Sequence, residues 1–185
     1  MTASTTTRLA QLLALAALAA PAGFAVPCAN AAQGPPTTPL TPTGQPSPYH
    51  SHALWATINV CNPKSAPDVV GIRGSMPGTG QSDETMYMRF RLQYMDTATG
   101  SWQDLGQGAD SGYLAVGDAT TSRQTGRSFT LRPSTTGVTL RGIINFQWRH
   151  DARVIYATER VTSADHTSLA GATPPGFTAA TCQFT

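Results

Sequence analysis

The chain has 185 residues, of which 40% are hydrophobic and 12% are charged, and its formal net charge is +2 at pH 7. Its 12 basic side chains nearly balance its 10 acidic ones, so no strong electrostatic field draws the protein to nucleic acid or to a membrane surface. A chain of this length is typical of one globular domain. Composition therefore argues against nucleic acid as a partner and favours a single-domain protein.

The N-terminal segment has the arrangement of a secretory signal peptide, in which a basic residue, an apolar run and a cleavage site follow one another. Arg8 precedes an unbroken apolar run over residues 9–20, which is shorter than the roughly 20 residues that a membrane-spanning helix needs. The helix breaker Pro21 follows this run,. Small residues in Ala29-Asn30-Ala31 suit a cleavage site,. We therefore expect residues 1–31 to be removed as a signal peptide, which predicts a secreted protein with no transmembrane segment in its mature chain.

Cys28 decides how many cysteines the mature protein carries. The favoured cleavage removes it, whereas two weaker sites at residues 20–22 and 23–25 would retain it,. Lipid attachment to Cys28 is the alternative, but the leucine-like residue that lipoprotein motifs carry three positions before the cysteine is absent. Without Cys28, Cys61 and Cys182 remain as an even pair in an oxidising compartment, which predicts one disulfide.

Residues 32–53 are predicted to be a disordered, proline-rich tether. Six prolines occur between residues 33 and 49, among Thr, Ser, Gly and Gln, a composition that favours extended conformations over a packed core. The tether ends near His50 and His52, which have no neighbouring cysteine or carboxylate,. We expect no metal site and no cofactor.

From Leu54 onward, short β-type runs alternate with Gly, Pro and Asp turn signals, and no stretch sustains a helical period,. This predicts a β domain over residues 54–185. The candidate strands are residues 54–61, 68–76, 85–95, 101–106, 111–117, 126–133, 137–150, 152–162 and 177–184.

Two of these runs indicate which side chains face the core. In 85–95 the even-numbered residues are apolar and most of the odd-numbered ones are polar, as in an antiparallel strand with one buried face,. The run 137–150 alternates in the same way. We expect a hairpin over residues 138–162, and a turn over residues 96–100 in which Gly100 has a positive φ.

The layout resembles an immunoglobulin-like or fibronectin type III-like domain. The stretch MRFRLQYMDTATGSW is similar to a central strand, its turn and the tryptophan of the next strand. We therefore expect an immunoglobulin-like antiparallel β-sandwich of about seven to nine strands with one disulfide. The antibody spacing of two cysteines around a tryptophan is absent, so the bridge is expected to tie the C-terminal tail to the N-terminal strand.

A narrower resemblance rests on three stretches, ATINVCN, GIRGSMPG and LRGIINFQWRHDARVIYATERVTSADH. They look like a recurring pattern in exported actinobacterial proteins that have no assigned activity. The resemblance implies an exported β-sandwich, and it supplies no catalytic residue.

Polar side chains on the outward positions of two strands form a candidate ligand face, because an immunoglobulin-like topology places these strands side by side. The residues are Tyr87, Arg89, Arg91, Arg141, Asn145, Gln147 and Arg149. Such a face suits an anionic or hydroxyl-rich polymer, such as a cell-wall polysaccharide, or another envelope protein.

The alternative interpretation is a solvated sheet face whose arginines cover apolar neighbours and pair with Glu159 or Asp151. Among the tryptophans, Trp148 shares the apolar face of its run and is expected in the core,. Trp102 lies next to a turn, which makes it the candidate platform for a sugar ring,.

Catalytic motifs are absent from the sequence: there is no Gly-x-Ser-x-Gly elbow, no His-Glu-x-x-His and no phosphate-binding loop,. We therefore expect no catalytic residues and predict a non-enzymatic binding or adhesion module. Two alternatives remain open. One is a small secreted hydrolase that uses Asp165 and His166, and the other is a purely structural envelope protein.

Overall fold

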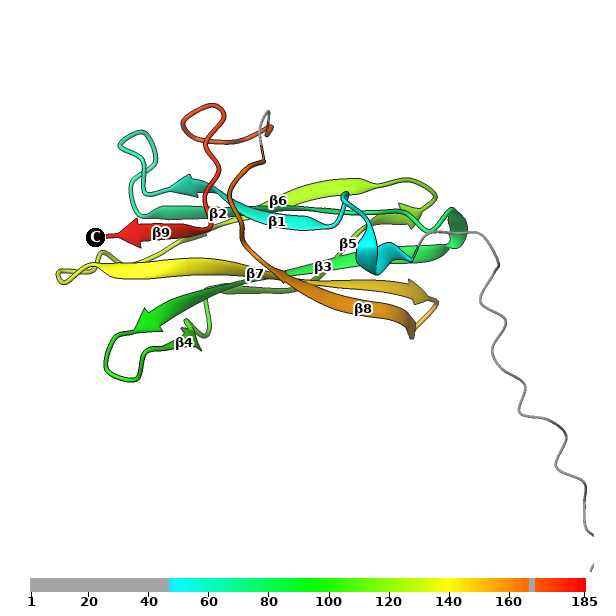
Figure 1. Cartoon of the computed structure of the whole chain (residues 1–185), viewed down its shortest axis with the longest axis horizontal. Coiled ribbons are helices and arrows are strands. Elements are labelled where there is room, and N and C mark those ends of the chain that lie inside the picture. Colours follow the sequence, from blue (N-terminus) through cyan, green and yellow to red (C-terminus); the bar gives the residue numbers. More distant parts are fainter. Residues whose placement is uncertain (1–46, 167–168) are drawn as a thin grey trace, which may run out of the picture. The chain divides into compact units, whose positions relative to one another are not determined.

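The computed structural model describes residues 47–166 and 169–185. These residues form nine β-strands in two antiparallel sheets, which confirms the all-β sandwich expected from the sequence (Figure 1). The first sheet contains β1 (Trp55–Cys61), β2 (Val69–Met76) and β6 (Arg123–Thr130). The second sheet contains β3 (Gln81–Asp96), β4 (Ser101–Asp104), β5 (Asp110–Ala119), β7 (Val138–His150), β8 (Arg153–Val161) and β9 (Thr181–Phe184).

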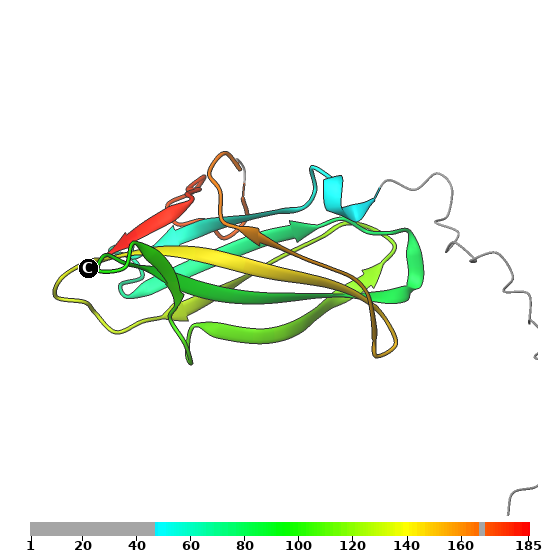
Figure 2. The same cartoon turned by 60° about the horizontal axis from the view of Figure 1, so that its bottom comes forward.

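The order of the strands is β1-β2-β6 in the first sheet and β4-β3-β7-β8 in the second. This is the immunoglobulin-like arrangement, in which the first two strands and a later one face a sheet built around the third strand and the penultimate hairpin. β5 also pairs with β3, and β9 also pairs with β7. Along its outer edge, β3 therefore pairs with β5 and then with β4. In the same way, β7 pairs along its outer edge with β9 and then with β8 (Figure 2).

The predicted alternation in the two central strands is confirmed. From β3, Met86, Met88 and Phe90 are fully buried, and β7 contributes Phe146 and Trp148. The opposite sheet supplies a further set of buried apolar side chains, Ile58, Val70, Ile72 and Met76. The core is therefore a single apolar layer between the two sheets, as expected for a sandwich.

Both predicted connections are present. β7 and β8 pair as an antiparallel hairpin around Asp151, whose φ is 52°. In the turn after β3, the amide of Gly100 donates to the carbonyl of Asp96 at 2.8 Å, and Gly100 has a φ of 67°. The Asp96 carboxylate accepts hydrogen bonds from the Thr99 hydroxyl and the Ala98 amide, which lower its pKa,.

The folded part of the chain begins before Leu54, where the predicted domain started. A 3-10 turn, η1 (Pro48–His50), precedes β1, and Pro48 is buried. The amide of Leu54 donates to the carbonyl of Ser51 at 3.0 Å, which continues this ordered entry. The predicted signal peptide and the predicted tether up to residue 46 lie outside the described residues, as does Cys28. The described part of the chain contains no α-helix, and therefore no helix that could cross a bilayer.

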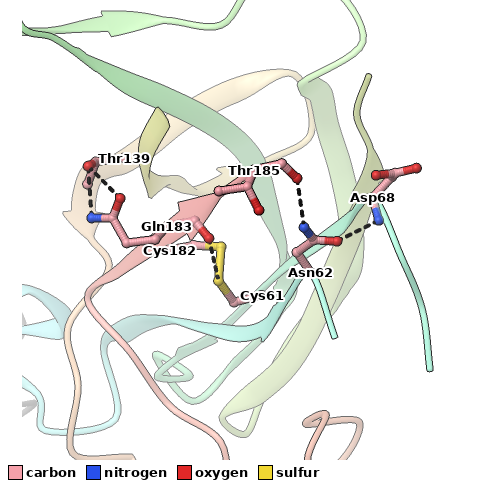
Figure 3. Close-up of a disulfide and its surroundings, with 7 residues drawn as sticks. All are labelled: Cys61, Asn62, Asp68, Thr139, Cys182, Gln183 and Thr185. Atoms are coloured by element: carbon pink, nitrogen blue, oxygen red, sulfur yellow. Dashed lines mark hydrogen bonds between the residues drawn. A yellow bond between two sulfur atoms is a disulfide. The ribbon is translucent and has the colours of Figure 1, made fainter. Parts of the chain in front are cut away.

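The predicted disulfide is present between Cys61, the last residue of β1, and Cys182 in β9, with 5.5 Å between their Cα atoms (Figure 3). It therefore ties the C-terminal strand to the N-terminal strand and links the edges of the two sheets. Next to it, the Asn62 side-chain amide donates to the carbonyl of Thr185 at 3.1 Å, and the Asp68 amide donates to the Asn62 side-chain oxygen at 2.8 Å. The C-terminus is thus held by a covalent bond and by hydrogen bonds.

The segment after β8 closes the sandwich along the outer edge of β1. The amide of Ser163 donates to the carbonyl of Ala56, and Ile58 exchanges two backbone hydrogen bonds of 3.0 Å with Ala179. Asn59 in β1 is buried, and its side-chain amide donates to the carbonyl of Gly171 at 2.9 Å. On the other side of the first sheet, β6 is an edge strand among the described elements. The edge of the first sheet at β1 is therefore covered by the segment that follows β8, whereas the edge at β6 has no further strand among the described elements.

Candidate functional site

The seven residues of the predicted ligand face come together on the outer surface of β3 and β7, and we call this surface the arginine face. The register of the two strands pairs Tyr87 with Gln147 and Arg89 with Asn145. Arg91 and Arg141 follow on the same face, because side chains two residues apart along a strand point the same way. The buried methionines and aromatics of these strands occupy the opposite face. The structure therefore brings these seven residues together on one face of the sheet, and their role as a ligand face stays a prediction.

The centre of the arginine face is neutralised by carboxylates. Arg89 forms a two-pronged salt bridge with Asp110 at the start of β5. Arg91 contacts Asp104 of β4 at 2.8 Å and Glu159 of β8 at 3.7 Å. The hydrogen bond from Arg89 holds the pKa of Asp110 below its ordinary value, and the same contact raises the pKa of Arg89,. These two arginines already have partners, as the alternative interpretation expected.

Only part of that alternative is correct. Glu159 does contact Arg91 and also accepts a hydrogen bond from the Asn145 side-chain amide at 3.0 Å. Asp151, the other expected partner, lies instead in the turn between β7 and β8, 3.7 Å from His150. Among the described residues, Asp151 makes no ion pair with an arginine of the face.

One end of the face has an arginine stacked on a tryptophan. The guanidinium of Arg141 lies over the indole of Trp102, 4.3 Å from the ring centroid, and its Nε donates to the side-chain oxygen of Gln93 at 2.9 Å. No carboxylate forms an ion pair with Arg141 in the described part of the chain. Partial burial lowers the pKa of Arg141, although the guanidinium stays charged at any physiological pH,. Trp102 is partly exposed, with the Arg141 guanidinium stacked on its ring, and its role as a sugar platform stays a prediction.

The other end of the face has an arginine between two tyrosines. The guanidinium of Arg149 lies 4.2 Å from the ring centroid of Tyr87 and 5.0 Å from that of Tyr113. Its Nε donates to the side-chain oxygen of Gln147 at 2.9 Å, and the Gln147 amide donates to the Tyr113 hydroxyl at 2.9 Å. Within the described residues Arg149 also lacks a carboxylate partner. Arg141 and Arg149 are eight positions apart on one strand, which corresponds to about 27 Å.

Four contributors to this surface were not among the predicted ligand residues: Gln93, Asp104, Asp110 and Tyr113. Gln93 continues the odd-numbered set of β3 and could have been included from alternation alone. The others lie on β4 and β5, whose pairing with β3 depends on contacts distant in sequence.

This arrangement can bind oxygen-rich groups without a cofactor. A guanidinium stacked on an aromatic ring keeps its N–H edge available for hydroxyl, carboxylate or phosphate oxygens, and the ring offers a surface on which a sugar can pack. Asp104, Asp110 and Glu159 can accept hydrogen bonds from hydroxyl groups between the two ends. Residues 47–166 and 169–185 contain no group of three or more His, Cys, Asp or Glu side chains arranged to hold a metal ion.

The residues of the alternative hydrolase do not form a triad. Nε2 of His166 lies 3.2 Å from the Ser163 hydroxyl, so a serine is within reach of the imidazole. Asp165, however, makes no hydrogen bond or ion pair with His166 in the described part of the chain, so the group that would orient the base is missing. The imidazole instead stacks on the indole of Trp55, with 4.4 Å between ring centroids.

The His166→Phe variant is expected to make stability less sensitive to pH. Burial lowers the pKa of His166 below its ordinary value, and the charge of Asp165 opposes this only in part. The unfolded chain therefore binds a proton more readily, and the free energy of unfolding falls as pH drops from about 7 to about 5. Urea titrations across this range should give a flatter profile for the variant, which keeps the stacking on Trp55 but cannot titrate. Equal slopes for both proteins would contradict this expectation.

No protein-family model matches the chain, and no curated protein matches it. The resemblance to exported actinobacterial proteins therefore stays a prediction. The functional argument rests on the geometry of the arginine face.

Proposed function

We propose that the protein is a secreted or cell-surface, non-enzymatic binding module whose arginine face binds an extended, oxygen-rich polymer of the cell wall. The supporting observation is the pair of stacked arginines that make no ion pair with any carboxylate of the described residues, Arg141 on Trp102 and Arg149 on Tyr87 and Tyr113. They lie about 27 Å apart along β7. A polymer lying along the strand contacts both, whereas a small ligand contacts only one.

The central residues favour hydroxyl groups over a dense polyanion. Arg89 and Arg91 are already paired with Asp110, Asp104 and Glu159, so a strongly anionic chain would meet three carboxylates between its two cationic contacts. A polysaccharide with hydroxyl groups along its length and scattered anionic substituents suits this order of charges. We therefore expect Arg141 and Arg149 to make the main contacts with the polymer, because Arg89 and Arg91 are already paired with carboxylates.

The Arg141→Gln/Arg149→Gln variant is expected to bind isolated cell walls of the source organism at least about tenfold more weakly than the wild type. Each lost charge-assisted contact costs about 1.5–3 kcal/mol, and about 1.4 kcal/mol corresponds to a tenfold change. Co-sedimentation of the secreted protein with purified wall material measures this, and binding should also weaken as salt rises.

The matched control is Arg127→Gln/Arg153→Gln, which removes two exposed arginines elsewhere and changes the net charge equally. This control should bind as the wild type does. Equal losses in both double variants would show general charge attraction and contradict a role for the face. Wild-type protein that does not sediment with the wall would favour the structural envelope protein instead.

Export supports the proposal and has its own test. The apolar leader and the disulfide between Cys61 and Cys182 suit an oxidising, extracellular location,. The intact mass of protein recovered from the culture medium should correspond to a chain that begins at Ala32. A secreted species that still contains Cys28 would contradict this cleavage site.

A further inference from the structure

An apolar pocket lies between the two sheets at the end of the sandwich that carries the C-terminus. Its walls are the connection between β4 and β5 (105–109) and the connection between β6 and β7 (131–137). The cavity volume is about 730 Å³, within the range of about 300–1,000 Å³ that is usual for small-molecule sites. In both views this end lies opposite η1, where the described chain begins (Figures 1 and 2).

The interior of the pocket is an uncovered part of the hydrophobic core. Leu140 and Phe184, both buried, belong to its lining. Other apolar side chains line it while packing against the core on one side only, namely Tyr94, Leu105, Leu131 and Val138. An apolar ligand would remove their remaining surface from water, which is favourable by about 25 cal/mol per Å².

Backbone hydrogen bonds hold both walls in place. On one side, the amide of Leu105 donates to the carbonyl of Leu92, and the amide of Leu92 donates to the carbonyl of Ala109, each at 3.0 Å. On the other side, the amide of Leu131 donates to the carbonyl of Asp68 at 2.8 Å. The pocket is therefore built into the fold, which reduces the ordering cost of binding.

The rim of the pocket carries a positive charge that has no partner among the described residues. Arg132 is the only charged residue that the described part of the chain contributes to the lining, and it is exposed. Unlike the arginines of the arginine face, it makes no ion pair, hydrogen bond or ring contact with any described residue. The hydroxyls of Ser134 and Thr136 lie in the same lining and are likewise without hydrogen bonds in the described part of the chain. An apolar interior with a free guanidinium and free hydroxyls at its rim complements an apolar chain with an anionic head.

We propose that this end pocket binds a long-chain fatty acid, with the alkyl chain between Leu131 and Phe184 and the carboxylate at Arg132. This site is independent of the arginine face, because the two share no residue. The proposal assigns the protein a second ligand class, a monocarboxylic amphiphile.

The fluorescent fatty acid cis-parinaric acid is the probe, with palmitate as the competitor and methyl palmitate as the neutral competitor. Wild-type protein should bind the probe saturably, and palmitate should compete better than its methyl ester. The Arg132→Glu variant should weaken probe binding by at least about tenfold, because attraction of the carboxylate becomes repulsion. The Arg132→Glu substitution should leave the affinity of the protein for methyl palmitate unchanged. The matched control Arg127→Glu should bind as the wild type does.

The Leu131→Trp variant, which fills the pocket, should abolish binding of both acid and ester, and its urea midpoint shows whether the fold is retained. Non-saturable binding to the wild type, or equal effects of Arg132→Glu and Arg127→Glu, would overturn the proposal. The Arg141→Gln/Arg149→Gln variant should bind the probe as the wild type does. Loss of fatty-acid binding can thereby be distinguished from loss of binding at the arginine face.

Discussion

The Cys61→Ser/Cys182→Ser variant is expected to have a free energy of unfolding about 2–5 kcal/mol lower than that of the wild type. The bridge joins residues separated by 121 positions, so it constrains nearly the whole folded domain in the unfolded state. The chain-entropy estimate for such a loop approaches about 5 kcal/mol. Since a typical domain has only about 5–15 kcal/mol of net stability, this is a large share of the total.

Urea unfolding of the oxidised wild type, the reduced wild type and the double variant measures this effect. Asn62→Ala is the matched control, because it removes the neighbouring hydrogen bonds to Thr185 and Asp68 while keeping the bridge. That control should cost only about 1–3 kcal/mol. Identical midpoints for the oxidised and reduced wild type would show that the bridge does not stabilise the domain.

The Trp148→Ala variant is expected to lose about 3–5 kcal/mol, the usual cost of truncating a buried tryptophan. Trp148 is fully buried in the middle of the core, and its ring meets Tyr156 edge-on with 6.3 Å between centroids. Its Nε1 donates to the carbonyl of Pro77 at 2.9 Å. The truncation therefore leaves both a cavity and a buried carbonyl without its donor, so the loss falls at the upper end of this range.

Trp102→Ala is the control for that experiment, because it makes the same substitution on the surface. Trp102 contacts the guanidinium of Arg141 and is only partly buried, so the expected loss is about 1 kcal/mol. Thermal or urea unfolding of both variants separates the two environments. Comparable losses would mean that Trp148 is not a central core residue. Where Trp148→Ala does not fold, Trp148→Phe gives the same ranking with a smaller cavity.

Local periodicity was enough to predict much of the fold. The alternation through Met86, Met88 and Phe90 indicated both the buried face of β3 and the polar face opposite it, and the structure confirms both. The turn at Gly100 followed from residue types alone. Such signals are local, since they depend on the strand period and on the φ angles that a residue tolerates.

The charge balance of the arginine face was not predictable in the same way. Asp104 and Asp110 look like turn residues in the sequence, and only the pairing of β4 and β5 with β3 brings them to Arg91 and Arg89. Strand pairing across the sheet depends on the global topology. The end pocket, which lies between two connections distant in sequence, was missed for the same reason.

The division of one sheet edge between β4 and β5 has a consequence for solubility. A long edge strand with free amides and carbonyls is a template on which other chains can add, and this is a common route to aggregation. Here β4 has only four residues, and the connection that follows turns back so that its backbone bonds to Leu92 of β3. The interruption leaves two separate edges, one along the four residues of β4 and one along the ten residues of β5, in place of one continuous edge. A protein concentrated at a surface would thereby present no uninterrupted template along this edge for cross-β assembly with its own copies.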